Sequence, residues 1–398
     1  MKTMKEWILN IKSLRGYDAL FIGLFVSLFC TQAITAVYLM IVLGISLYKK
    51  ELIPALRKQP GALWIYGFIG LQIVVSAWAS NMVGLVNALG MGLVMAWLAL
   101  YRDKIHPKTL ILGIDLMLVL SILTGIYALF QFQTFSQAEG YSFWEFHIQN
   151  SPKRRIMATF GNANLYATML EMWIFLAVYR FTQNKKISYR IFVVLVSLFN
   201  FGLLLLTGCR TAILPFVIVI PLFLWLAKEK GWFWVSMIVI GIGILFVCLD
   251  PTKIPRITDM STLESRFKIW RCAWIGFCAY PLFGLGPQSY GLYYRIFDGH
   301  KAPHCHNIYI DAFASYGVVG VVLLLVYAFR FLLPEIFSMR KKDSAVFGLM
   351  VGMIGIFLIH GLLDVTMNVL ATSLVFLMIL NAAPLYKKIE NPSESMIS

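Results

Sequence analysis

The run AFASYGVVGVVLLLVYAFRFLL, residues 312–333, is long enough to cross a lipid bilayer as a helix. The hydrocarbon core of a bilayer takes about 20 consecutive apolar residues, and the only charge in this run, Arg330, lies near its end. Directly before it stands APHCHNIYID, residues 302–311, with two histidines. The sequence therefore predicts a membrane helix that begins beside ionisable side chains.

The rest of the chain has the same character. Of its 398 residues, 60% are hydrophobic and 13% are charged, and the mean hydropathy is +0.77, which is unlike a soluble globular domain. We predict an all-α polytopic membrane protein with one membrane domain, residues 1–398. The first two of its expected spans could instead form one long tilted helix or two short ones separated near Gln32. The twelve predicted spans are 17–31, 32–48, 62–80, 82–101, 109–131, 164–182, 190–209, 211–227, 231–249, 308–333, 344–362 and 366–386.

Basic residues indicate the orientation of these spans. The start MKTMKEWILNIK has no small-residue cleavage pattern, so we expect no cleaved signal peptide. With twelve spans, most of the 34 Lys and Arg residues fall on the side of the N-terminus, as the positive-inside rule requires. We therefore expect both termini, including a short disordered tail at 387–398, in the cytoplasm. Orientation and contact with anionic lipid explain the net charge of +15, and no nucleic-acid partner is expected.

Two segments outside the predicted spans are longer than a tight turn: 132–163 and 250–306. We expect both on the extracytoplasmic side and any chemistry within them, the second being the catalytic loop. Basic residues gather on this side, although the usual bias places them in the cytoplasm. Their presence favours an anionic ligand. On charge alone, an ordinary solvated loop is an equally good explanation. These residues are Lys153, Arg154, Arg155, Arg210, Lys253, Arg256, Arg266, Lys268, Arg271, Arg295 and Lys301.

The second loop contains the stretch STLESRFKIWRCAWIGFCAY, residues 261–280, which predicts an amphipathic helix. Ser261 or Thr262 can cap its start, and the proline and glycines that follow would end it. Arg266 and Trp270 share one face at a spacing of four. Such a helix suits the headgroup layer, so Trp270 is as readily an interfacial anchor as a substrate contact.

Arg210 lies between two apolar runs with almost no loop. A charged residue costs about 2.5–3.5 kcal/mol at the centre of a membrane helix and less toward the interface, so it is usually paired or functional. Snorkelling of its side chain to external water is the alternative. A guanidinium can make two parallel charge-assisted hydrogen bonds to phosphate, and Arg210 together with Arg266 would suit a diphosphate.

His304 and His306 are two positions apart, which is about 200° around a helix. If the helix has already begun there, the two rings point in different directions, and only one of the histidines can belong to the site. That histidine can take a proton near neutral pH. Neither HExxH-like spacing, nor paired external acids, nor metal-binding cysteine spacing is present. The sequence therefore predicts no metal and no other cofactor.

Four further acidic or imidazole side chains fall inside or beside the predicted spans. Asp115 and Glu171 are more readily explained by bonds to neighbouring helices than by a cavity role. His360 and Asp364, at a spacing of four, could form a simple pair, and a supporting role at the site is the alternative.

Four stretches, in this order, resemble the signatures of the O-antigen ligase and O-antigen polymerase superfamily. They are MATFGNANLYATML at 157–170, TGCRTA around Arg210, SRFKIWRCAW followed by YPLFGLGPQSY at 265–290, and HNIYIDAFASYGVVGVVLLL at 306–325. The resemblance implies a metal-independent, inverting glycosyltransferase of the bacterial cytoplasmic membrane. Such an enzyme moves a glycan from an undecaprenyl diphosphate carrier to the hydroxyl of a glycan or glycolipid acceptor.

By this resemblance, the essential histidine falls on His306 and the essential arginines on Arg210 and Arg266. The sequence departs from the family at Ser315, where many relatives have glutamate, and at Cys209, which is often serine. These departures leave the three proposed catalytic residues in place. Substrate-binding residues are expected to be Arg210, Arg266, Arg271, Arg155, Asn164 and Trp270.

Two alternatives stay open at this point. A transporter or flippase of lipid-linked glycans is the competing class, although it would place its charges near mid-membrane, whereas here they gather at one rim. Within the enzyme class, a ligase and a polymerase differ only in the acceptor. The expected partners are the undecaprenyl diphosphate-linked donor, the acceptor and membrane lipids.

Overall fold

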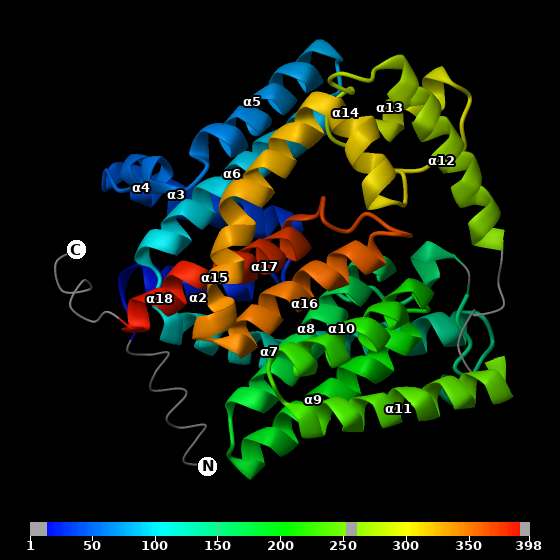
Figure 1. Cartoon of the computed structure of the whole chain (residues 1–398). Coiled ribbons are helices and arrows are strands. Elements are labelled where there is room, and N and C mark those ends of the chain that lie inside the picture. Colours follow the sequence, from blue (N-terminus) through cyan, green and yellow to red (C-terminus); the bar gives the residue numbers. More distant parts are fainter. Residues whose placement is uncertain (1–13, 150, 252–260, 391–398) are drawn as a thin grey trace.

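The computed structural model describes residues 14–149, 151–251 and 261–390 (Figure 1), and every regular element in these ranges is helical. The predicted all-α class is confirmed. The longer helices are α2 (Gly16–Ser27), α3 (Gln32–Tyr48), α4 (Leu52–Lys58), α5 (Ala62–Trp78), α6 (Met82–Lys104), α7 (Pro107–Ala138), α8 (Ala163–Gln183), α9 (Ile187–Leu206), α10 (Ile213–Leu226), α11 (Lys230–Leu249), α12 (Ser261–Ala279), α13 (Tyr290–Ile296), α14 (Ile308–Tyr327), α15 (Leu333–Lys342), α16 (Ser344–His360), α17 (Leu370–Leu380) and α18 (Ala383–Glu390). Short helical turns are η1 (Phe143–Glu145), η2 (Pro152–Arg154), η3 (Arg210–Ala212) and η5 (Ala328–Leu332).

Each of the twelve predicted spans contains a helix, but the twelve-span plan is not confirmed. In the described part of the chain, five segments are long and apolar enough to cross a membrane: α6, α7, α9, α11 and the continuous segment Ile308–Lys342. The pair α3 and α4, bent by 98°, would add a sixth if it forms one span. Several other apolar helices have only 10–17 residues.

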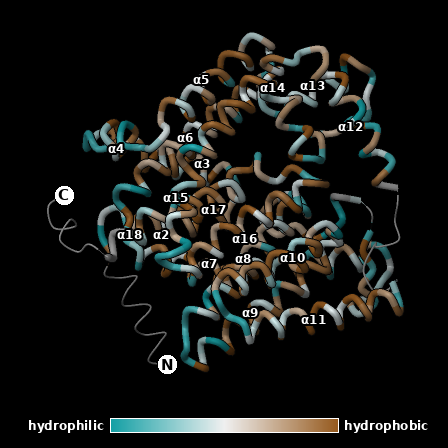
Figure 2. Tube along the Cα trace, viewed as in Figure 1, coloured by the Kyte–Doolittle hydropathy of each residue, from teal (hydrophilic) through white to brown (hydrophobic). Residues whose placement is uncertain are grey.

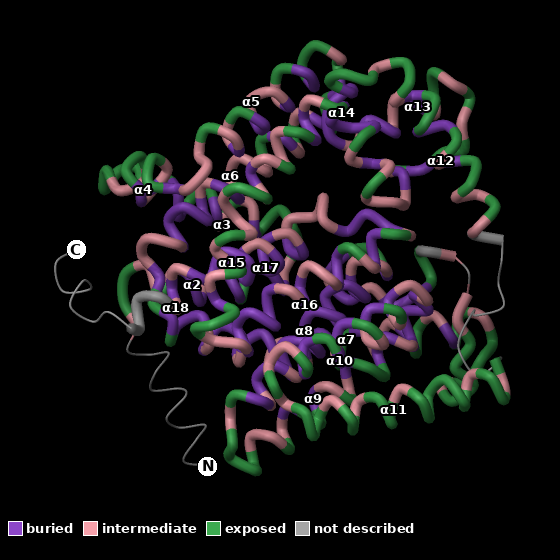
Figure 3. The backbone as a smooth tube through the Cα atoms, viewed as in Figure 1, coloured by how far each residue is buried: buried purple, intermediate pink, exposed green. Residues whose placement is uncertain are grey.

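Helices α8 and α11 mark the inside and the outside of this bundle. Helix α8 is buried on nearly all sides and contacts α7, α9, α10, α16 and α17. Helix α11 is apolar along its length, yet none of its residues is buried (Figures 2 and 3). An apolar helix that the protein leaves uncovered is suited to contact lipid.

The predicted span 308–333 is a broken helix. Gly317 has φ 61° and ψ −177° inside α14, a conformation that is essentially restricted to glycine. The segment after α12 fills the break: Val318 N–H donates to Pro281 O (2.8 Å), Val319 N–H to Leu282 O (3.0 Å), and Gly286 N–H to Ser315 O (3.0 Å). Because of these bonds, α12 is held beside the first half of α14.

Several predicted boundaries were wrong. Helix α7 continues to Ala138, into the expected loop 132–163, and the last expected span ends at Leu380 before α18 resumes as far as Glu390. The beginning of the expected disordered tail is therefore helical, while 391–398 lie outside the described residues, as do Lys253 and Arg256. Residues 17–48 form two separate helices and not one long helix, and the second of them starts at Gln32.

Candidate active site

Two asparagines set the starts of the helices that carry the site. Asn162 caps α8, accepting hydrogen bonds from the N–H groups of Asn164 (2.8 Å) and Leu165 (3.4 Å). Asn307 caps α14 in the same way, with the N–H groups of Tyr309 (3.0 Å) and Ile310 (2.9 Å) as donors. An asparagine side chain satisfies N–H groups that have no partner in the first turn of a helix.

The turn after α16 clamps the start of α14. Ile308 N–H donates to Gly361 O (2.8 Å), and Asn307 Nδ2 donates to Leu362 O (3.0 Å). A Cβ on Gly361 would lie 2.5 Å from Ile308 Cγ2, so only glycine allows this approach. The clamp brings Asp364 next to His306, whose own φ of 50° lies in the left-handed region that non-glycine residues seldom adopt.

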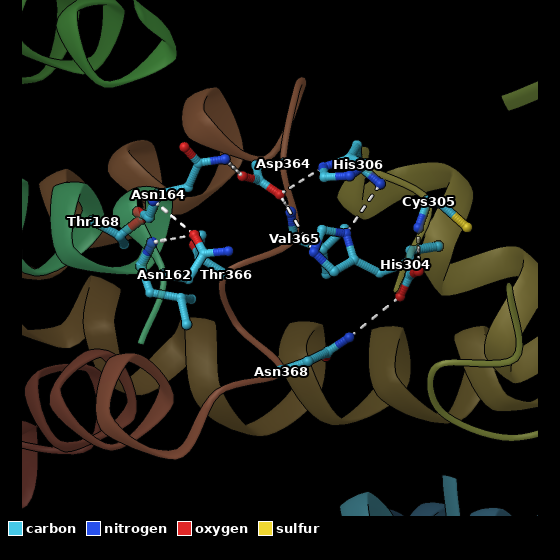
Figure 4. A network of polar contacts seen from close by, with 12 residues as sticks. Asn162, Asn164, Thr168, His304, Cys305, His306, Asp364, Val365, Thr366 and Asn368 are labelled. Atoms are coloured by element: carbon cyan, nitrogen blue, oxygen red, sulfur yellow. Dashed lines mark hydrogen bonds and ion pairs between the residues drawn. The ribbon is translucent and has the colours of Figure 1, made fainter. Parts of the chain in front are cut away.

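Asp364 is the centre of the polar network in Figure 4. Its side chain is 3% exposed. One carboxylate oxygen, Oδ1, lies 3.1 Å from His306 Nδ1 and accepts from Val365 N–H (2.8 Å), while Oδ2 accepts from Asn164 Nδ2. Burial acts to raise the pKa of Asp364, but the hydrogen bond from His306 and the charges of His304 and His306 outweigh it. The pKa therefore lies well below its usual value, and the carboxylate is ionised at neutral pH.

His304 and His306 face the same carboxylate, contrary to the expectation that they diverge. The helix starts only at Ile308, so helical spacing does not apply to them. Their ring centroids are 4.3 Å apart, and His304 Nε2 lies 3.6 Å from Asp364 Oδ1. Burial lowers the pKa of His304, against the raising effect of Asp364.

The hydrogen bonds assign a proton to each ring. His304 Nδ1 accepts from the backbone N–H of His306 (3.2 Å), so the proton of a neutral His304 lies on Nε2. An ionised carboxylate can only accept, so His306 donates from Nδ1 and its Nε2 is the basic nitrogen. In the described part of the chain, this Nε2 has no hydrogen-bond partner.

The same three side chains are the one group that could hold a metal ion in the residues described. One ligand atom each from His304, His306 and Asp364 lies within 4.8 Å of the others. The sequence argument against a metal was therefore incomplete, because the third ligand comes from a distant turn. The fit is nevertheless poor: the two nitrogens that face the carboxylate both carry protons in this network, and a cation would have to displace them.

Arg210 on η3 and Arg266 on α12 lie near this network. Burial lowers the pKa of Arg266, and so does the positive charge of Arg210, whereas the charge of Asp364 raises it. Arg266 is therefore within electrostatic range of both Arg210 and Asp364. Asp364 is the hydrogen-bond partner of His306, so the three residues expected to be catalytic fall in one region of the structure.

The other expected substrate-binding residues have different surroundings. Arg155, 6% exposed, donates to Asn164 Oδ1 (2.8 Å) and Gly208 O (3.4 Å), and so links the start of α8 to the turn before Arg210. Trp270 is half-buried against Phe267, with ring centroids 5.4 Å apart. Arg271 is exposed and lies about 140° around α12 from Arg266.

Residues 192–325 match the O-antigen ligase family. This O-antigen ligase match confirms the resemblance seen in the sequence motifs. Together with the apolar helices, it indicates a multi-pass protein of the bacterial inner membrane with a glycosyltransferase-like function in polysaccharide assembly. The family implies lipid-linked glycan and glycan acceptor substrates in general. No curated protein matches the chain.

Asp364 lies outside the O-antigen ligase match; the sequence offered a supporting role at the site as an alternative but did not identify His306 as its partner. The suggested pair with His360 is wrong: His360 Nδ1 instead contacts both carboxylate oxygens of Glu171 (2.9 and 3.1 Å) inside the bundle. The prediction that Asp115 bonds a neighbouring helix is confirmed, because Arg180 Nε donates to Asp115 Oδ1 (2.7 Å). The spacing of Asp364 from His360 could have placed Asp364 at the end of the membrane span. No feature of the neighbouring sequence, however, indicated that His306 is its partner.

Proposed function

We propose that the protein is a metal-independent, inverting glycosyltransferase that moves a glycan from an undecaprenyl diphosphate carrier to an acceptor hydroxyl. The observation that carries this proposal is the His306–Asp364 pair, in which Nδ1 is held by the buried carboxylate and Nε2 is basic. A positioned imidazole of this kind is suited to general base catalysis. Arg210 and Arg266 beside it supply the charge that a diphosphate requires.

In the reaction, His306 Nε2 takes the proton of the acceptor hydroxyl as its oxygen attacks the anomeric carbon. The new carbon–oxygen bond forms on the face opposite the carrier, so the configuration inverts. The bond between the anomeric carbon and the diphosphate oxygen breaks, and undecaprenyl diphosphate leaves with the electron pair. Asp364 stabilises the imidazolium that forms, and the protein needs no covalent intermediate.

The arginines act on the leaving group. Two guanidinium groups can each make forked hydrogen bonds to phosphate oxygens and balance the charge that grows on the diphosphate. Donor and acceptor meet at the outer lip of the bilayer in this proposal, where the diphosphate lies at headgroup level and the polyprenyl tail stays in lipid. Arg155 and Asn164 orient Asp364 and the turn of Arg210 rather than contact the sugar.

The transporter alternative gains little from the broken helix α14. Transporters use unwound helices to expose backbone groups to their cargo, whereas here the N–H groups of Val318 and Val319 are bonded to the protein's own 281–282 segment. The break therefore positions a loop and does not line an open binding site.

Transfer by the purified protein in detergent separates the two classes. Detergent removes the compartments, so a transporter has no product, while a transferase couples a lipid-diphosphate-linked glycan to the acceptor. We expect acceptor-dependent release of undecaprenyl diphosphate. Its absence, with protein that is folded and binds the donor, would favour the transporter. Gene deletion then assigns the acceptor: loss of chain extension indicates a polymerase, and intact polymer left on its carrier indicates a ligase.

A further inference from the structure

A cavity of about 530 Å³ opens beside the N-terminal end of α16, away from the candidate active site. Helix α16 has 17 residues, so at 1.5 Å per residue this cavity and His360 lie about 25 Å apart along the helix. The α10–α11 turn forms one wall, and the end of α15 forms the other. The residues that matter are Lys228, Lys230, Arg340, Lys341, Trp225 and Phe347.

Four basic side chains line this cavity. In the described residues, none of them forms an ion pair with an acidic side chain. The neighbouring acids are engaged elsewhere: Glu229 lies 3.5 Å from Lys185 Nζ, and Asp343 caps α16 by accepting from the N–H groups of Ala345 and Val346 (3.0 Å each). Four like charges around one cavity favour an anionic ligand.

Apolar surface adjoins the charged cavity. Of the two aromatic residues that line it, Phe347 is buried and Trp225 is 62% exposed. The uncovered helix α11 starts at Lys230 and exposes Trp234 one turn further on. Tryptophan at the level of lipid headgroups next to an apolar surface is typical of a membrane interface. A ligand of this site meets cations and hydrocarbon together, which suits an amphiphile better than a soluble ion.

We propose that this cavity binds the headgroup of an anionic phospholipid. The phosphate lies among Lys228, Arg340 and Lys341 and bridges the α10–α11 turn to the end of α15, and the acyl chains lie along Trp225 and α11. Basic pockets between membrane helices bind anionic headgroups by this chemistry. The site is separate from the transferase site and does not depend on the function proposed for it.

Quenching of Trp225 fluorescence by brominated lipids tests the proposal. The full chain is reconstituted in phosphatidylcholine vesicles that contain a small fraction of dibrominated phosphatidylglycerol or dibrominated phosphatidylcholine. The signal of Trp225 is the difference between the wild type and a Trp225→Phe variant. We expect the anionic lipid to quench Trp225 strongly at mole fractions at which the zwitterionic lipid has little effect.

Two matched triple variants locate the charges. For Lys228→Gln/Arg340→Gln/Lys341→Gln, a fivefold loss per cation predicts an apparent affinity roughly a hundredfold lower. Lys50→Gln/Arg57→Gln/Lys186→Gln removes the same charge from exposed positions outside the cavity and should leave the quenching unchanged. Equal quenching by the two lipids, equal loss in both variants, or displacement of the lipid by excess inorganic phosphate would each overturn the proposal.

Discussion

At the scale of single residues, the central contact is the bond from His306 Nδ1 to Asp364. It fixes the tautomer of a ring that otherwise has two equivalent nitrogens, and it leaves Nε2 for an acceptor. His304 cannot replace His306 as the base in this arrangement, because Nδ1 of His304 already accepts from the His306 backbone. The two histidines therefore differ in their hydrogen bonds as well as in their distance from Asp364.

Substitution of Arg210 or Arg266 by lysine should lower the transfer rate by about tenfold or more, or about 1.4 kcal/mol in the barrier. Lysine keeps the charge but loses the fork that fits two phosphate oxygens. Initial rates with purified protein measure the effect. Arg295→Lys, exposed on α13, serves as the control. Wild-type rates in both lysine variants would assign these arginines to orientation in the membrane.

Exhaustive chelation should leave the transfer rate unchanged. The histidine nitrogens that face Asp364 carry protons in the hydrogen-bond network, and the proposed diphosphate is balanced by arginines instead of a cation. The rate is compared before and after treatment with a chelator, and then with added divalent metal. If activity is lost and returns only with metal, the His304–His306–Asp364 group is a metal site and the arginine scheme fails.

At the scale of elements, the sequence predicted the end of α12 well, because the terminating Pro281 is a local signal; the expected cap at Ser261 or Thr262 stays a prediction. It did not predict the break in α14. Gly317 stands in an apolar run that reads as one continuous helix, and only the 281–286 segment docked against it shows why the chain leaves helical geometry. The predicted start of this span at 308 agrees with α14, which begins at Ile308 after its cap Asn307; only the supposition that the helix had already begun at the two histidines was wrong.

Gly317→Ala should destabilise the protein. The glycine-only backbone alone costs about 1–3 kcal/mol for another residue, and an added Cβ would lie 2.4 Å from Leu282 O. The measurement is the temperature of unfolding or aggregation in detergent. Gly291→Ala, in α13 with nothing near its Cβ, is the matched control. Equal stability of the two variants would show that the 281–286 segment is not docked on α14 as described.

At the scale of the whole molecule, the candidate site joins segments that are far apart in the chain. Asn164 and Asp364 are separated by 200 positions, and His306 and Asp364 by 58. Local motifs identified the arginines and the histidines of the site, because charge and residue order are properties of short stretches. The partner of His306 depends on how α8, α14 and α16 pack, which periodicity and spacing do not determine.

Labelling of single cysteines in intact cells tests the orientation of the membrane domain. With the native cysteines replaced, a cysteine at Lys268 on α12 should react with an impermeant reagent, and one at Lys186 should not, because basic residues otherwise sort inward. Both positions are exposed in the folded chain. The reverse pattern would put the candidate site on the cytoplasmic side and would exclude a donor presented outside.

The most direct test of the account is the transfer rate of purified His306→Ala and His304→Ala proteins at equal amounts. General base catalysis contributes about 10²–10⁴-fold, so His306→Ala should lose activity by that order while it keeps donor binding. His304→Ala, which removes only a neighbour of the base, should lose much less. An inactive His304→Ala protein beside an active His306→Ala protein would contradict the assignment of His306 Nε2 as the base.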